Sequence, residues 1–123
     1  MECVHYPEGN LDDIIVNNLD GSKEGEEVIT YSNFIDSEEG TPLNLIVNVK
    51  STSEYDPANA NQNGNIEDGE FGQININTDS SVTLEFTLVD PNTGAPVEIP
   101  GIYVSVYDLG MNHDFFLFFF VFL

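Results

Sequence analysis

The sequence contains no Arg, no Trp and only two Lys residues, Lys23 and Lys50, against 22 Asp and Glu. The formal net charge is therefore −20 over 123 residues. A folded domain with such a field repels phosphate backbones and anionic membranes, which excludes nucleic acid as a partner. The carboxylates cannot be neutralised internally, so we expect divalent cations, calcium first, among the partners. We also expect stability to rise with ionic strength.

Cysteine and long hydrophobic runs are also scarce. Cys3 is the only cysteine, which excludes an internal disulfide framework. The first ten residues have neither a basic n-region nor an apolar h-region, so we expect no signal peptide within this chain. The longest apolar run, residues 115–123, would span about 13 Å as a helix, which is too short to cross a bilayer. We therefore expect no transmembrane span.

Helical periodicity is almost absent, and residues 11–19 are the only ambiguous stretch. Short runs of alternating polar and apolar residues are present instead. In residues 82–89 the apolar positions Val82, Leu84, Phe86 and Leu88 fall on one face of a strand. Further strands are predicted at 43–50, 71–77 and 102–107, with weaker candidates at 14–16, 28–31 and 97–99.

Turn residues rich in Asn, Gly and Pro separate these runs. The pattern predicts an all-β domain, built as an antiparallel β-sandwich or jelly roll. We expect residues 1–13 to be a lead-in, residues 14–110 the module and residues 111–123 an apolar tail. The inward positions predicted for 43–50 are Leu43, Leu45, Val47 and Val49, and Ile74 and Ile76 share one face of 71–77.

Several strings carry a resemblance: VNNLDG (16–21), YSNF (31–34), FGQIN (71–75), VDPNTGAPV (89–97) and VYDLG (106–110). The chain resembles an acidic, largely uncharacterised β-sandwich module that recurs in predicted surface and secreted proteins of marine microalgae. The resemblance spans roughly residues 14–110, and its motifs are turns and strands rather than catalytic residues. It implies an extracellular or cell-surface location, as part of a larger protein.

The apolar tail, FFLFFFVFL, has three interpretations. The chain end is truncated or mis-spliced, or the tail is a terminal strand packed in the core, or it is an anchor for a membrane or a partner. Uninterrupted Phe leaves no wet face for an ordinary strand, and an exposed run of this kind promotes aggregation. The sequence favours the first interpretation, a fold truncated at its C-terminal end.

The loop at 59–70, NANQNGNIEDGE, has the spacing of a twelve-residue calcium loop. Calcium takes six to eight hard oxygen ligands, and such loops supply them from odd positions and a final carboxylate. Gly64 stands at position six, where the loop turns. The ordinary alternative, which the flanking Pro57 and strand favour, is a solvated hairpin connection around the turn dipeptide Asn63-Gly64. The metal ligands predicted here are Asn59, Asn61, Asn63, Asn65, Glu67 and Glu70.

The other acidic clusters are expected to be solvated loop faces. They comprise Asp12 and Asp13, then Glu24, Glu26 and Glu27, then Glu38 and Glu39, with Asp108 after the strand at 102–107.

Catalytic constellations are missing. His5 and His113 stand near the two ends of the chain without ligand or triad partners, and no nucleophile motif occurs. We therefore expect no enzyme. Tyr31, Tyr55, Tyr103 and Tyr107 are either a sugar-stacking platform or ordinary strand residues with their hydroxyls at the wet edge.

These observations predict a non-catalytic extracellular or surface module for binding or adhesion. The predicted binding is assisted by calcium and directed at glycans or another protein. The alternative is a purely structural acidic repeat domain adapted to saline surroundings. A solvated acidic surface is compatible with both functions, and calcium dependence distinguishes them.

Overall fold

The computed structural model describes residues 9–19, 27–37, 39–50, 55, 57, 60–66, 69, 71–77, 82–97, 103–111 and 114–122; for Asn77, 103–111 and 114–122 it describes the backbone alone. Within these residues the secondary structure is eight strands and a single 3-10 turn, η1. The elements are β1 (Ile14–Asn17), β2 (Val28–Asp36), β3 (Pro42–Val49), η1 (Ala60–Gln62), β4 (Gly64–Ile66), β5 (Phe71–Asn77), β6 (Leu84–Val89), β7 (Tyr103–Met111) and β8 (Asp114–Phe122).

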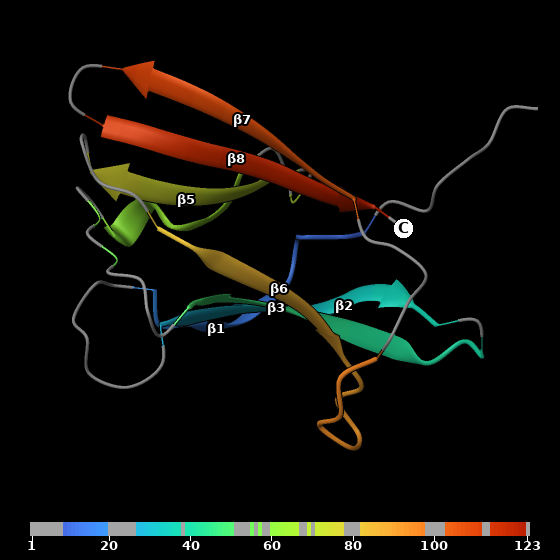
Figure 1. Ribbon diagram of the computed structural model, residues 1–123. Coiled ribbons are helices and arrows are strands. Elements are labelled where there is room, and N and C mark those ends of the chain that lie inside the picture. The colour runs from blue at the N-terminus through green and yellow to red at the C-terminus, as the bar shows by residue number, and fades with distance from the viewer. Residues whose placement is uncertain are drawn as a thin grey trace, which may run out of the picture.

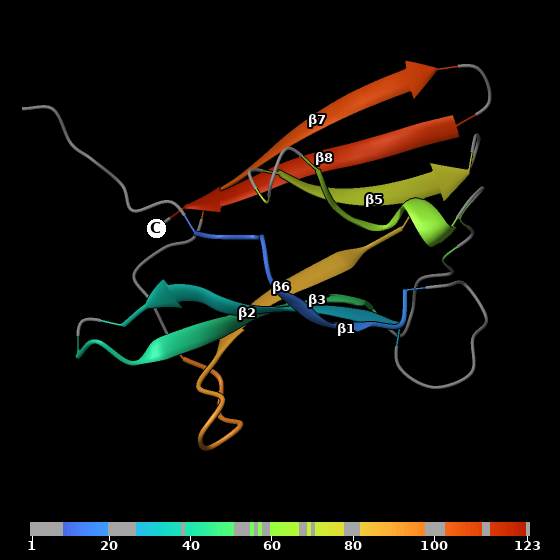
Figure 2. The same cartoon turned by 180° about the vertical axis from the view of Figure 1, so that it is seen from behind.

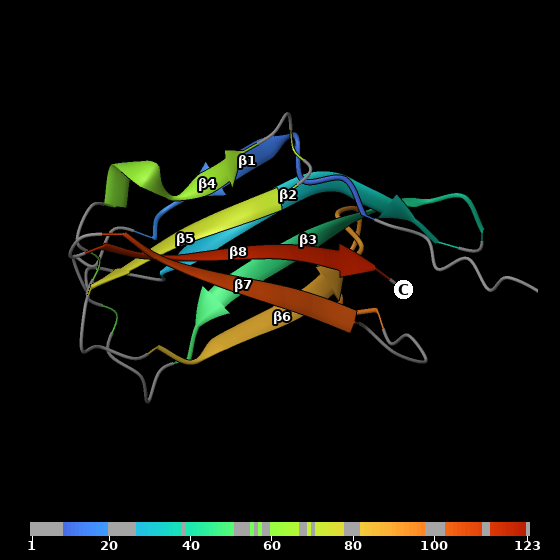
Figure 3. The same cartoon turned by 90° about the horizontal axis from the view of Figure 1, so that it is seen from above.

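The strands form two four-stranded antiparallel sheets. The first sheet has the order β1-β2-β3-β6, and the second has the order β4-β5-β8-β7. Figures 1 and 2 show the second sheet lying above the first, and Figure 3 shows their strands crossing when seen from above. The chain passes from the first sheet to the second after β3, returns after β5, and passes again after β6. The prediction of an all-β, antiparallel protein is confirmed.

The predicted alternation is confirmed in β3 and β6. Leu43, Leu45 and Val47 are buried, and their neighbours Asn44 and Ile46 are only half-buried. In β6 Leu88 is buried while Glu85 is exposed. A strand that covers a core on one face and meets water on the other gives this pattern.

The β2 strand is longer than the predicted run at 28–31 because a bulge lets it continue. The register between β2 and β3 shifts between Tyr31 and Ile35. Within this interval Asn33 has a φ of 50°, a left-handed conformation that Asn adopts more readily than most residues. Phe34 lies just beyond and is buried. The bulge therefore turns the side chain of Phe34 toward the core.

The Phe-rich run at the C-terminal end forms most of β8, which pairs with β5 on one side and β7 on the other. The tail is therefore a strand by its backbone pairing, while its packing in the core and the proposed truncation stay predictions. Ile74 is opposite Leu117 and Ile76 is opposite Phe115 in the β5–β8 ladder. A strand with a neighbour on each side has its backbone groups paired, which a solitary apolar run would not have.

The segment before β1 joins the two sheets. The backbone N–H of Asn10 donates to the carbonyl of Phe34 in β2 at 2.7 Å, and that of Leu11 donates to Gly69 at 3.2 Å. The side chain of Asn65 in β4 donates to the Leu11 carbonyl at 2.7 Å. Residues 9–13 therefore contact both β2 and the β4–β5 connection, and the predicted lead-in is in part bonded to the domain.

One apolar cluster includes side chains from both sheets. Leu45, Val47 and Ile29 come from the first sheet and Ile74 comes from the second, each with none of its surface exposed. Burying side chains of this size stabilises a fold by about 1.5–3 kcal/mol each. The packing of the two sheets therefore depends on the centre of this cluster.

Leu45→Ala should lower the free energy of unfolding by about 2–5 kcal/mol, because it leaves a cavity at the centre of the cluster. Ile15→Ala, at a side chain that is 56% exposed, serves as the control and should change stability by less than about 1 kcal/mol. Urea unfolding followed by circular dichroism measures both. Equal effects of the two substitutions would contradict this placement of the core.

Candidate functional site

Asn63 is at the centre of the predicted calcium loop, between η1 and β4, and its side chain is buried. Its amide nitrogen donates to the carbonyl of Leu19 at 2.6 Å and to the hydroxyl of Tyr55 at 2.7 Å. Its amide oxygen accepts the backbone N–H of Asn75 at 2.6 Å. The amide nitrogen therefore donates two hydrogen bonds, and the amide oxygen accepts one, all within the protein. We call this set of four residues the Asn63 hub.

The hub continues the β4–β5 ladder beyond Gly64, the first residue of β4. The strand β4 has three residues and β5 has seven, and Gly64 pairs with Gln73 as the first partner in β4. In an antiparallel ladder the N–H and C=O of one residue point to the same side, so Asn75 presents both groups beyond β4. Asn63 accepts its N–H and the Tyr55 hydroxyl donates to its C=O at 2.6 Å. Side chains thus replace the missing strand.

Hydrogen bonds from the first sheet also reach Asn63 and Gly64, at the start of β4. The side chain of Asn17 in β1 donates to the backbone carbonyl of Asn63 at 3.1 Å. The hydroxyl of Tyr31 in β2 donates to the carbonyl of Gly64 at 2.7 Å and is buried. The start of β4 is therefore held from β1, β2 and β5 together.

The predicted tyrosine platform is wrong for Tyr31 and Tyr55. Their side chains are 0% and 3% exposed, so neither ring can stack on a sugar. Their hydroxyls are also bonded inside the protein and not at a wet edge, because a buried phenol needs a partner. The side chains of Tyr103 and Tyr107 lie outside those that the structure describes.

Burial changes the ionisation of both tyrosines. Burial raises the pKa of Tyr55 to about 12, with the charge of Glu27 acting in the same direction and the hydrogen bond from Asn63 opposing it. Burial alone raises the pKa of Tyr31 far above its usual value. Both phenols are therefore neutral donors at physiological pH, as their hydrogen bonds require.

The remaining predicted ligands are placed in part. Asn61 is exposed in η1, and Asn65 is half-buried in β4, where its amide nitrogen donates to the backbone of Leu11 and Asp12. Asn59, Glu67 and Glu70 lie outside the described residues. Within the described part of the chain no three His, Cys, Asp or Glu side chains come together as a metal site. The calcium site stays a prediction, with the oxygen of Asn63 directed at Asn75.

Most acidic side chains of the described segments are exposed, and Glu27 of the predicted clusters is half-buried. Asp12, Asp13, Glu39 and Glu85 are exposed, and Asp13 accepts a hydrogen bond from the Ser32 hydroxyl. The residues Glu24, Glu26 and Glu38 of the predicted clusters lie outside the description, and for Asp108 it covers the backbone alone. Solvent and salt can therefore screen the described carboxylates.

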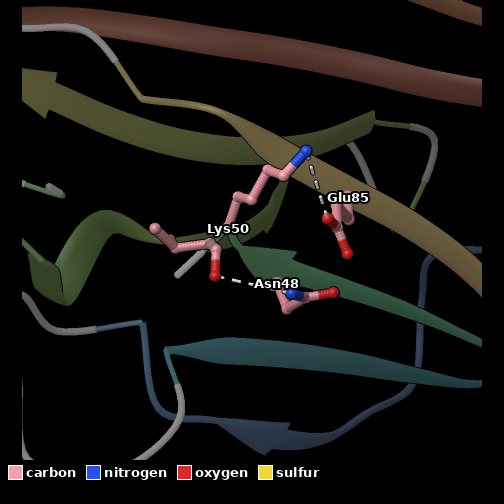
Figure 4. Close-up of polar contacts among 4 residues, drawn as sticks. Asn48, Lys50 and Glu85 are labelled. Atoms are coloured by element: carbon pink, nitrogen blue, oxygen red, sulfur yellow. Dashed lines mark hydrogen bonds and ion pairs between the residues drawn. The ribbon is translucent and has the colours of Figure 1, made fainter. Parts of the chain in front are cut away.

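Lys50, one of the two lysines, lies just after β3 and faces Glu85 of β6 (Figure 4). The Lys50 nitrogen and the Glu85 carboxylate oxygen are 4.0 Å apart, and the two side chains are 51% and 50% exposed. An exposed pair at this distance contributes little to stability, about 0–1 kcal/mol. The close-up in Figure 4 also shows the side chain of Asn48, which donates to the backbone at Val49 at 3.4 Å. This pair therefore does little to offset the net charge of −20.

Comparisons with protein-family models, with curated proteins and with solved structures find no match for the chain. The resemblance to a microalgal module therefore stays a prediction. Within the described residues no helix has the length and apolarity that a membrane span requires. The function has to be argued from the residues and their contacts.

Asn63→Ala should lower the free energy of unfolding by about 2–4 kcal/mol, because it leaves the Leu19 carbonyl and the Asn75 N–H without their partner. Asn92→Ala is the matched control, since Asn92 is exposed in the turn after β6 and should cost less than about 0.5 kcal/mol. Chemical unfolding of the two variants measures the difference. If Asn63→Ala is as stable as its control, the hub does not hold the edge of β5.

The raised pKa values of Tyr31 and Tyr55 predict alkaline destabilisation. A phenol whose folded pKa exceeds its unfolded value of 10.0 stabilises the fold fully below pH 10. That stability falls as the pH rises from 10 toward 12, by about 1.4 kcal/mol per pH unit for each phenol. Unfolding midpoints measured across this range, with tyrosinate absorbance at 295 nm, test the loss. Ionisation of all five tyrosines near pH 10 in the folded protein would contradict it.

Proposed function

We propose that the chain is a non-catalytic, structural β-sandwich of jelly-roll type, whose acidity keeps it soluble in saline surroundings. Two sheets that share one apolar cluster support the sandwich, and so does a chain that passes repeatedly from one sheet to the other. The proposed surface or secreted location, within a larger protein, rests on the resemblance described above.

The main observation in favour of the structural function is that the Asn63 amide forms hydrogen bonds within the protein. A calcium loop needs the oxygen at its fifth position to face the ion. In this chain that oxygen accepts the N–H of Asn75, and the nitrogen of the same amide bonds to Leu19 and Tyr55. The side chain predicted as the ligand at the fifth position therefore joins parts of the fold instead.

The acidic surface supports the same function. The buried polar side chains of the described residues are Thr30, Asn63, Gln73 and Asn75, and none of them is a carboxylate. Carboxylates kept at the surface stay hydrated and repel other copies of the chain at short range, which favours solubility even where salt screens part of the charge.

Calcium-assisted binding to glycans or to another protein is the competing proposal. It rests on the spacing of residues 59–70, in which Asn59, Glu67 and Glu70 would supply oxygen ligands together with Asn61 and Asn65. The two proposals differ in how they respond to calcium, because a specific site binds the ion beyond what ionic strength explains.

We expect calcium chloride and sodium chloride at matched ionic strength to raise the melting temperature equally, because salt only screens the surface charge. Differential scanning calorimetry of the full chain measures both. The charge-neutralising variants Glu67→Gln and Glu70→Gln should behave like Glu39→Gln, whose side chain is exposed in the β2–β3 turn. A further rise with calcium that Glu67→Gln or Glu70→Gln abolishes and Glu39→Gln retains would establish the calcium site and overturn the structural proposal.

A further inference from the structure

The hub contains the only Asn-Gly dipeptide of the sequence, Asn63-Gly64. The fold requires both residues. Asn63 supplies the amide that bonds to Leu19, Tyr55 and Asn75. Gly64 has a φ of 146°, a conformation that side-chain-bearing residues rarely adopt, and a Cβ added there would lie 3.3 Å from the Ile14 side chain. A chemically labile sequence is therefore fixed at the point where the sheets meet.

Asn-Gly is labile because glycine leaves the backbone nitrogen open to react. The nitrogen of Gly64 attacks Cγ of Asn63, and a new N–Cγ bond closes a five-membered succinimide ring. The Cγ–Nδ2 bond breaks, and the side-chain nitrogen takes up a proton and leaves as ammonia. Water then opens the ring at either carbonyl, which gives aspartate or isoaspartate at position 63. The overall reaction converts an amide and water into an acid and ammonia, without oxidation or reduction.

The folded structure opposes the first step. The leaving nitrogen is held by the Leu19 carbonyl and the Tyr55 hydroxyl, and the oxygen on the same carbon is held by the Asn75 N–H. The nucleophile belongs to Gly64, which is paired with Gln73 in the β4–β5 ladder. Ring closure requires the side chain to rotate toward its own backbone, so these bonds have to break first. The side chain is also only 7% exposed, which restricts water.

The product cannot rebuild the hub. A carboxylate at position 63 has no N–H to donate, so one of its oxygens would stand 2.6 Å from the Leu19 carbonyl oxygen, where the amide nitrogen stood. Two acceptors at this distance repel, and the Asn75 N–H, which still donates to the other oxygen, is too little to compensate a buried charge. Isoaspartate also inserts a side-chain carbon into the backbone just before Gly64, which shifts its register with Gln73.

We propose that Asn63-Gly64 is a conformation-gated deamidation site. The folded chain is protected, and a chain that stays open is converted to a form that cannot refold. The modification then records time spent unfolded and makes prolonged unfolding irreversible. This inference depends on the hub alone and holds for a structural and for a calcium-binding module.

The experiment incubates the full chain in mildly alkaline buffer, folded or unfolded by guanidinium chloride, and follows deamidation at position 63 by peptide mapping with mass spectrometry. A reaction that proceeds only through the open state slows in proportion to the open fraction, so we expect it to be at least about a hundredfold slower in the folded chain. Asn92, exposed in the turn after β6, is followed by the β-branched Thr93, so it should react slowly in both conditions and gives the background rate. Equal rates at position 63 in the folded and unfolded chain would overturn the gating.

The second arm tests refolding. Chains aged in guanidinium chloride should fail to recover native circular dichroism on dilution, in proportion to the fraction deamidated at position 63. The variant Asn63→Asp should share this loss, and Asn92→Asp, which adds the same charge at an exposed position, should refold as the parent does. Full recovery of chains deamidated at position 63 would overturn the claim that the product cannot refold.

Discussion

The buried amide of Asn63 bonds at one point to residues that are far apart in the chain. Leu19 follows β1, Tyr55 lies between β3 and η1, and Asn75 is in β5. The amide bonds to the edge of β5 just before the three-residue β4 begins, so a side chain takes the place of strand pairing there. Because every one of these hydrogen bonds is buried, removing one partner leaves the other polar groups in a low-dielectric interior without a hydrogen bond. The hub is therefore a constraint on both sheets.

The apolar cluster and the hub stabilise the fold in different ways. The cluster of Leu45, Val47 and Ile74 provides a non-directional driving force that brings the sheets together. The hub and the Tyr31 bond to Gly64 are directional and fix where β4 begins. Such bonds specify register more than they add stability, which is valuable in sheets where a slip of one residue reverses every side chain.

Much of this fold can be predicted from the sequence, and the reasons are local. The inward positions of β3 and β6 follow from strict alternation, and the bounds of β5 match the predicted run at 71–77. Alternation says nothing about what covers the second face of a strand. The alternation predicts solvent-facing side chains at Gln73 and Asn75, yet both residues are buried. Residues 62 and 63, which precede β4, form hydrogen bonds with them along the edge of β5. The β2 strand extends past its predicted end because its bulge depends on contacts that a single strand does not reveal.

The candidate site was harder to predict. The turn dipeptide at Asn63-Gly64 is visible in the sequence and lies in the loop that forms the hub, whereas the oxygen spacing around it predicts a calcium site that stays a prediction. The partners of Asn63 are not visible in the sequence, since Leu19 lies 44 residues and Asn75 12 residues away. The tyrosine interpretation was wrong for the same reason: the acceptors of Tyr31 and Tyr55 belong to β4 and β5.

Native-state hydrogen exchange at the backbone amide of Asn75 tests the hub most directly, because its proton is bonded to the Asn63 side chain and not to a strand. If the hub holds the edge of β5, this amide exchanges only when the whole domain unfolds, as slowly as the central amides of β3. Rapid exchange through local opening, while the β3 amides stay protected, would contradict the account.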